Sequence, residues 1–200
     1  MTPTKTALLT IDLQNDFLHA DGAYGRAGQS APAIAALPDR IAPLRKALLD
    51  AGGTYISAQF TLVPSRNGDP LIAPHLKKLR PFLTKGDFTP GGFGHALVDQ
   101  LCPADFTIEK VAYSAFYQTR LDYVLGAMGI STLIIGGIVT NGGVASTVRD
   151  AHVRNIHTIL LSDGCAAFND DVHDATLVSL GSVTETLTCD EATAQIGYAP

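Results

Sequence analysis

The chain has 200 residues, of which 46% are hydrophobic and 16% charged, and its formal net charge is −5. This length predicts about one domain, and we assign residues 1–200 to a single domain whose core needs no disulfide or structural metal. The acidic balance argues against nucleic acid or an anionic membrane surface as the main partner, and no apolar run is long enough to cross a membrane.

Three cysteines, Cys102, Cys165 and Cys189, are widely spaced and form no Cys-x-x-Cys pair. An odd number at this spacing argues against a disulfide framework or a zinc site. The N-terminal segment has a short apolar run that is broken by Asp12, unlike a signal peptide. We therefore expect a cytoplasmic protein with reduced thiols, and we expect no metal and no cofactor.

Strand-like and helix-like segments alternate from the N-terminus onward. Ala7–Ile11 and Thr54–Phe60 are short apolar runs with β-branched side chains, which predicts two strands. Between them, Ala33–Ala51 carries apolar residues at helical spacing, and a Gly-Gly pair ends that helix. The segment Thr61–Phe93 is irregular and rich in Pro and Gly, and a connection of this length is usually functional or covers a site.

The second half of the chain continues this alternation. Its expected elements are a strand over Phe106–Val111, a helix opened by a capping box at Thr119–Asp122, a strand over Thr132–Ile138, a helix over Asn141–Arg154, a strand over His157–Ser162, a helix over Asp171–Leu180 and an edge strand over Ser182–Leu187. Alternating strands and helices imply right-handed crossovers and a mostly parallel sheet covered on both faces. The sequence therefore predicts an α/β fold whose ligands bind at the carboxyl ends of the strands.

Charged side chains stand at two of these strand ends. Asp12 ends the first strand and Lys110 ends the third. A buried charge is costly without a partner, and a lysine offsets that cost for an aspartate. Ordinary structural explanations remain open for each residue, since Asp12 can cap a turn and Lys110 can lie along the sheet with its ammonium in water. Considered together, the two residues are the catalytic candidates.

A tight turn, Thr140-Asn141-Gly142-Gly143, follows the fourth strand. Backbone N–H groups at such a turn suit an anion or a developing oxyanion, although a plain strand-to-helix turn has the same pattern. An enzyme that forms acyl intermediates places its nucleophile there, and a glycine has no side chain to attack with. The other candidates are weaker, because we expect Cys165 to be a small buried residue and Ser146 has no histidine base beside it. His173 lies in an acidic stretch that we interpret as a helix N-terminus and not as a metal site.

Three motifs, LLTIDLQNDF (Leu8–Phe17), EKVAYSAFYQTRLDYVL (Glu109–Leu125) and GGIVTNGGVASTVRDA (Gly136–Ala151), cover much of the chain in a specific order and spacing. In that order they resemble the isochorismatase-like hydrolases, also called the cysteine hydrolase superfamily. The resemblance implies a three-layer Rossmann-like fold with a six-stranded, mostly parallel sheet, and a homodimer or homotetramer. It also implies a cis peptide bond between Ile138 and Val139, just before the turn.

Gly143 occupies the position of the family's catalytic cysteine. Isochorismatases also lack that cysteine and cleave a vinyl ether, so the resemblance implies a cysteine-independent hydrolase of a small anionic metabolite. Asp12 is then the general acid/base, and Lys110 holds it and helps to place the substrate. The substrate contacts implied for this chain are Phe17, Gln59, Tyr113, Phe116, Asn141 and Gly142, although Gln59 also fits an ordinary polar residue at a strand end.

Two other functions remain open at this point. The chain could be a non-catalytic family member that binds a ligand, in which case the substitution Asp12→Asn would hardly matter. It could also be an amidohydrolase whose nucleophilic cysteine has been replaced at Gly143. In that case a Gly143→Cys variant would gain amidase activity.

Overall fold

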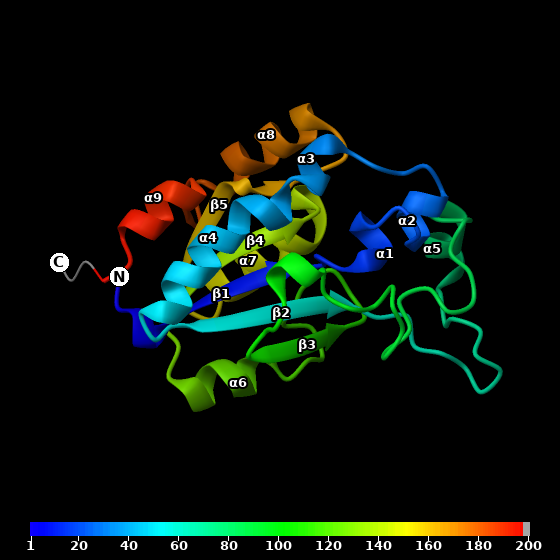
Figure 1. Ribbon diagram of the computed structural model, residues 1–200, viewed down its shortest axis with the longest axis horizontal. Helices are drawn as coiled ribbons and strands as arrows, with labels where there is room; N and C mark the ends of the chain where they lie inside the picture. Colours follow the sequence, from blue (N-terminus) through cyan, green and yellow to red (C-terminus); the bar gives the residue numbers. More distant parts are fainter. Residues whose placement is uncertain (198–200) are drawn as a thin grey trace.

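The computed structural model describes residues 1–197, which form a six-stranded parallel sheet in the order β3-β2-β1-β4-β5-β6 (Figure 1). The strands are β1 (Thr6–Ile11), β2 (Thr54–Phe60), β3 (Phe106–Lys110), β4 (Thr132–Ile138), β5 (His157–Ala166) and β6 (Glu185–Leu187). Every neighbouring pair is parallel, which confirms the predicted α/β fold. β5 is longer than predicted because, after an irregularity in its pairing with β4, Cys165 and Ala166 pair again with the end of that strand.

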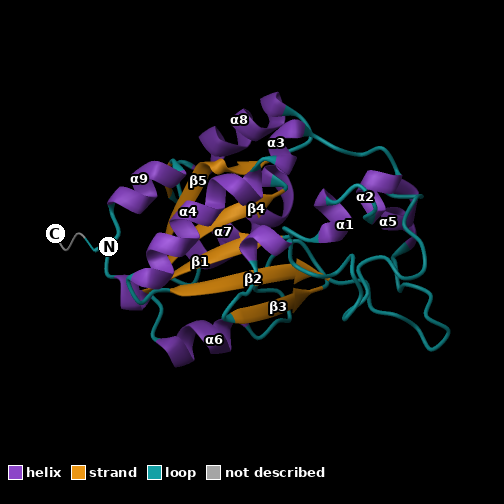
Figure 2. Ribbon diagram, in the orientation of Figure 1, coloured by secondary structure: helices purple, strands orange, loops and turns teal. Residues whose placement is uncertain are grey.

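Helices cover both faces of the sheet (Figure 2). They are α1 (Asn15–Leu18), α2 (Ala23–Arg26), α3 (Pro32–Ala35), α4 (Leu37–Asp50), α5 (Pro74–Leu79), α6 (Leu121–Met128), α7 (Ala145–His152), α8 (Asp170–Leu180) and α9 (Cys189–Ala194), with short turns η1 (Pro3–Lys5), η2 (Asp99–Leu101) and η3 (Thr140–Val144). Apolar side chains of α6 and α7 pack on one face, and those of α3, α4 and α9 pack on the other. Among residues 1–197, no helix combines the length and the apolar character that a membrane span requires.

The strands alternate between these two apolar layers. Ile56 and Ala58 of β2 lie in the layer with α6 and α7, whereas Tyr55 lies in the layer with α4. A period of two is expected for a strand whose two faces are both covered. The same period decides which side chains at the strand ends can meet.

The predicted capping box at the start of α6 is wrong. The hydroxyl of Thr119 accepts from the amide of Leu121 at 3.1 Å and donates to the carbonyl of Ala115 at 2.5 Å. Asp122 is engaged elsewhere, in an ion pair with Arg154 at 2.9 Å. The threonine therefore binds backbone groups of its own turn and does not bond the third residue of the helix.

Residues 61–93 of the segment between β2 and β3 lie, with α1 and α2, beyond the carboxyl ends of β1 and β2 (Figure 1). A buried carboxylate joins these pieces, because Asp16 accepts from the amide of Ala23 at 2.8 Å and from that of Phe88 at 2.5 Å. Phe88 also packs against the ring of Phe17, at 4.6 Å between ring centroids. This long segment therefore covers the edge of the sheet at which parallel α/β folds bind ligands.

Candidate active site

Asp12 follows the last residue of β1 and has a backbone φ of 59°. This left-handed conformation is uncommon for residues other than glycine and tends to persist where the surroundings impose it. The amide of Asp12 donates to the carbonyl of Ala58 at 2.9 Å, which continues the pairing of β1 with β2. The left-handed turn therefore lets the carboxylate leave the strand while its amide stays bonded to the sheet.

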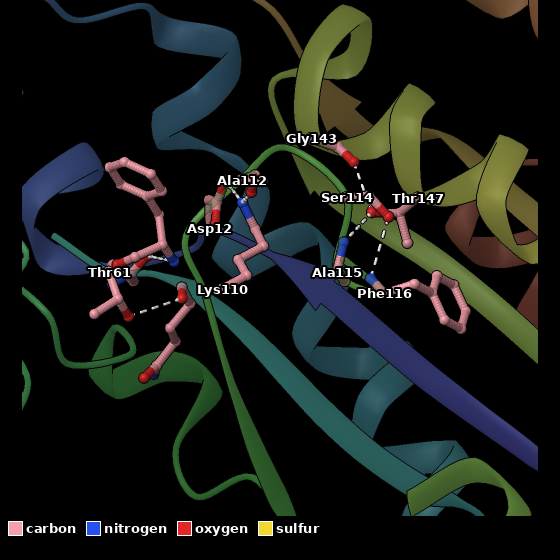
Figure 3. Close-up of polar contacts among 12 residues, drawn as sticks. Asp12, Thr61, Lys110, Ala112, Ser114, Ala115, Phe116, Gly143 and Thr147 are labelled. Atoms are coloured by element: carbon pink, nitrogen blue, oxygen red, sulfur yellow. Dashed lines mark hydrogen bonds and ion pairs between the residues drawn. The ribbon is translucent and has the colours of Figure 1, made fainter. Parts of the chain in front are cut away.

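Lys110, the last residue of β3, meets this carboxylate from two strands away. Its ammonium donates to Oδ2 of Asp12 at 2.8 Å, and both side chains are buried (Figure 3). The ammonium also donates to the carbonyl of Ala112 at 3.2 Å and lies 5.5 Å from the centre of the Phe60 ring. The strand-end pattern thus brings the acid and the amine together, as the sequence predicts.

The second oxygen of the Asp12 carboxylate differs from the first in its hydrogen bonding. Within residues 1–197, Oδ1 of Asp12 is buried and has no hydrogen-bond partner. Burial raises the pKa of Asp12 above its ordinary value of 3.8, and the charge and hydrogen bond of Lys110 oppose that rise. One oxygen is therefore held by a cation while the other is available to give or take a proton.

Gly143 lies directly against this pair. The peptide bond between Ile138 and Val139 is cis, as the resemblance implies, and the chain then forms the π-helical turn η3. A Cβ atom on Gly143 would lie 2.9 Å from Cγ2 of Ile11 and 3.3 Å from Oδ2 of Asp12. The backbone of the turn therefore approaches the carboxylate so closely that a Cβ on Gly143 would be in tight contact with Asp12 and would require Ile11 to shift.

Hydrogen bonds hold the turn in this position. The hydroxyl of Thr147 donates to the carbonyl of Gly143 at 2.7 Å and accepts from the amide of Ala115 at 3.0 Å (Figure 3). The amide of Gly142 donates to the carbonyl of Val139 at 2.9 Å. The expectation that the N–H groups of this turn suit an anion is therefore wrong for Gly142, whose N–H is used inside the turn.

The aromatic residues implied by the resemblance lie in different environments. Tyr113 borders the turn, because a Cβ on Gly142 would lie 3.7 Å from its ring. Phe17 packs 6.4 Å from the Phe60 ring, measured between centroids, and the Lys110 ammonium lies against that same ring. Phe116 is buried in the core and points away from Asp12 (Figure 3), so the structure does not bring it to the site.

The structure also separates the two implied amide side chains from the Asp12–Lys110 pair. Gln59 is in register with Glu109, one position before the pairing of Phe60 with Lys110. Strand alternation therefore places Gln59 on the opposite face from Lys110. Asn141 is exposed and borders a surface cavity that η3 and α7 form with α8.

Sequence reasoning missed two residues near the pair, Tyr24 and Arg80. Nε of Arg80 donates to the phenol oxygen of Tyr24 at 2.8 Å, and the ring of Tyr24 packs 4.7 Å from that of Phe17. These residues are 56 positions apart and belong to no regular periodic pattern. The only signal in the sequence is that the irregular segment Thr61–Phe93 is long enough to cover a site.

None of the three cysteines lies in a setting that produces a thiolate. Burial is the main cause that raises the pKa of Cys165 far above its ordinary range, and it raises that of Cys189 to about 12. Cys102 is exposed, and burial of its thiol also raises its pKa. The thiolate is the nucleophilic form, so a thiol mechanism has no support in these environments.

His173 is part of a helix start, as predicted. Asn169 caps α8 by accepting from the amide of Val172 at 3.0 Å, and Nδ1 of His173 lies 2.8 Å from the hydroxyl of Thr140. Among residues 1–197, no group of three or more His, Cys, Asp or Glu side chains is placed to hold a metal ion.

Comparisons with known proteins agree with this architecture. Residues 6–191 match the model of the isochorismatase domain. The chain is 34% identical over 169 residues to the ureidoacrylate amidohydrolase RutB of Methylorubrum extorquens AM1, covering 79% of this chain and 68% of the relative. It is 31% identical over 194 residues to RutB of Methylobacterium radiotolerans, covering 90% of this chain and 74% of the relative.

Solved structures give the same result. A cysteine hydrolase from Pseudomonas syringae pv. phaseolicola 1448A superposes with a TM-score of 0.83 at 26% identity, covering 98% of this chain and 94% of the other. The N-carbamoylsarcosine amidase of Thermoplasma acidophilum superposes with a TM-score of 0.73 at 25% identity, covering 94% and 98%. Both similarities extend over nearly the whole of each chain.

Proposed function

The chain belongs to the isochorismatase family, and from this premise we propose that it hydrolyses a small anionic metabolite without a cysteine nucleophile. Asp12 is the general acid/base and Lys110 holds it in place. One observation carries the proposal: the carboxylate is bound by Lys110 at Oδ2 and is unpartnered at the buried Oδ1, among the residues that the structure describes. A group in this state is suited to proton transfer.

The substrate that best fits this arrangement is a vinyl ether of a carboxylic acid. Protonated Asp12 transfers its proton from Oδ1 to the terminal carbon of the enol ether, which leaves an oxocarbenium ion. Water adds to that cation, and the resulting hemiketal breaks down to an alcohol and a 2-keto acid such as pyruvate. The proton released by the attacking water restores Asp12. General acid catalysis of this kind contributes about 10²–10⁴-fold.

Lys110 has two effects on this step. Its ammonium fixes the carboxyl group through Oδ2, so the proton-bearing oxygen is Oδ1. Its charge also stabilises the carboxylate that remains after proton transfer, which lowers the energy of the charged state. Burial acts in the opposite direction and favours the protonated acid before the reaction.

Hydrolysis of a C–N bond is the second candidate, because the relatives at 34% and 31% identity are named ureidoacrylate amidohydrolases. Without a thiol, Asp12 would then act as a base on water and would need its deprotonated form. The two candidates therefore differ in the sign of their pH dependence. Activity on a vinyl ether falls as the pH rises through the pKa of Asp12, whereas activity on a C–N bond rises.

Replacement of a former cysteine at Gly143 meets a steric obstacle. A Cβ at this position would lie 2.9 Å from Cγ2 of Ile11 and 3.1 Å from the carbonyl oxygen of Ile138, so the neighbours would have to shift. The turn as it stands is fitted to glycine. A Gly143→Cys variant is therefore expected to gain no amidase activity, and a gain would favour the amidohydrolase alternative.

The experiment that tests the proposal measures turnover of vinyl ethers, ureido acids and carboxamides before and after treatment with iodoacetamide. We expect turnover of a vinyl ether that alkylation leaves unchanged. Mass spectrometry of the exposed Cys102 shows that the reagent has reacted. Loss of turnover on alkylation would contradict the proposal, and binding without turnover of any of these compounds would favour the non-catalytic alternative.

A further inference from the structure

Arg80 is a half-buried cation that follows α5 in the segment covering the site. Its Nε donates to the phenol oxygen of Tyr24 at 2.8 Å, and its guanidinium also interacts with the side chain of Tyr113. Tyr24 comes from α2, and Tyr113 comes from the segment after β3. Arg80 thus joins three parts of the chain that are far apart in sequence.

The positive charge of Arg80 has no carboxylate partner within residues 1–197. The arginines and lysines in ion pairs there are Arg26, Lys46, Lys110 and Arg154. The phenol oxygen of Tyr24 satisfies one of the five N–H donors of the guanidinium, but it does not neutralise the charge. A partly buried guanidinium that is held in position and has no counter-ion is suited to an external anion.

Arg80 also lies close to the catalytic candidates. Its partner Tyr113 borders Gly142, because a Cβ on that glycine would lie 3.7 Å from the tyrosine ring. Its partner Tyr24 has a raised pKa, mainly because it is buried; Arg80 opposes this rise and the Asp12 carboxylate adds to it. Both partners of Arg80 therefore connect it to the turn and to Asp12.

The charge of the surrounding segment points to the same type of ligand. Residues 61–93 contain five Lys or Arg and two Asp, in a chain that carries 14 basic and 19 acidic residues in total. Asp87, one of the two acids, is already paired with Arg26 at 2.5 Å. An acidic protein that covers its candidate site with a basic segment attracts anions to that site.

We propose that Arg80 binds the carboxylate of the substrate, while Tyr24 and Tyr113 hold the guanidinium in place. Substrate selection and chemistry are then divided: Arg80 selects a carboxylic acid, and Asp12 acts on the bond that the bound acid presents. This inference deepens the proposed function and rests on it for the chemistry. The binding itself can be tested without turnover.

The test measures binding of pyruvate and of its neutral analogue pyruvamide by ligand-observed NMR titration. We expect saturable binding of pyruvate to the wild-type protein, weakened by about tenfold or more in Arg80→Met, because the charge-assisted bonds are lost. Binding of pyruvamide is expected to change by less than about twofold, since it carries no charge to pair with Arg80.

Two further variants separate this role from a structural one. Arg80→Lys keeps the positive charge without the planar fork, and we expect it to restore part of the pyruvate affinity. Lys78→Met removes an exposed charge from the same segment and serves as the matched control, with both affinities unchanged. Thermal unfolding shows whether each variant is folded.

Three results would overturn the inference: no saturable pyruvate binding to the wild type, unchanged pyruvate affinity in Arg80→Met, or equal losses for pyruvate and pyruvamide. Failure of the proposed function is a separate result, because it appears as absent vinyl-ether turnover while pyruvate binding and its dependence on Arg80 persist.

Discussion

Asp12 and Asp16 are two buried carboxylates four residues apart, and their surroundings differ in kind. Asp16 accepts from the backbone amides of Ala23 and Phe88, one at each oxygen, and so joins α2 to the segment before β3. Within residues 1–197, Asp12 is bound at one oxygen only, by the ammonium of Lys110. A buried carboxylate that accepts a hydrogen bond at each oxygen is typical of a structural role, whereas a buried carboxylate oxygen without a partner is typical of a catalytic group.

The backbone around each carboxylate shows the same difference. Gly94 packs so tightly on Asp16 that a Cβ there would lie 2.1 Å from Oδ2, which leaves no room for a ligand. At Asp12 the close approach is made by Gly143, which belongs to the turn η3. The comparison therefore predicts opposite consequences for the same substitution at the two positions.

The largest expected effect is on turnover in Asp12→Asn. We expect a loss of about 10²–10⁴-fold, because an amide cannot supply the proton that the carboxyl group transfers. In Asp16→Asn we expect a change of less than about tenfold in the folded protein, since Asp16 does not contact the reacting atoms. Both are measured as kcat on the vinyl ether. Equal losses in the two variants would remove the distinction between them.

The substitution at Asp16 is expected to affect stability more than turnover. Asp16→Asn should lower the free energy of unfolding by on the order of 3 kcal/mol, because one side-chain oxygen cannot accept from two amides. Urea denaturation measures this difference. Asp50→Asn is the matched control, since that residue is exposed and pairs with Lys46 only at the surface, where such pairs contribute about 0–1 kcal/mol. Unchanged stability in Asp16→Asn would contradict its structural role.

A smaller effect is expected in Gly143→Ala. The added methyl group would contact Ile11 and Asp12, so we expect kcat to fall on the order of tenfold and stability to fall by about 1–3 kcal/mol. Gly126→Ala is the control, because a Cβ there meets nothing within 4 Å and should stabilise α6 by up to about 1 kcal/mol. Full activity in Gly143→Ala would show that the close approach of the turn is unnecessary.

The sequence predicted the parts of the molecule that depend on periodicity. Apolar runs and their ends located the strands, and the rule that ligands bind at carboxyl ends selected Asp12 and Lys110 without a structure. The positive φ of Asp12 could not be predicted, because it follows from contacts with β2 and β3 that form only in the folded protein.

Residues outside the periodic segments were harder to place. The family motif drew attention to Phe116, but a motif does not state which way a side chain points, and this ring lies in the core. Arg80 was missed because its partners Tyr24 and Tyr113 are 56 and 33 positions away, in segments with no regular spacing. Such long-range polar contacts require coordinates.

The most direct measurement is an NMR titration of the Asp12 carboxyl carbon, assigned by its absence in Asp12→Asn. We predict a midpoint above the ordinary value of 3.8, because burial disfavours the carboxylate. In Lys110→Met the midpoint should rise further, since the cation that stabilises the carboxylate is gone. A midpoint at or below 3.8 in the wild type, or a lower one in Lys110→Met, would contradict the assignment of Asp12 as the proton donor.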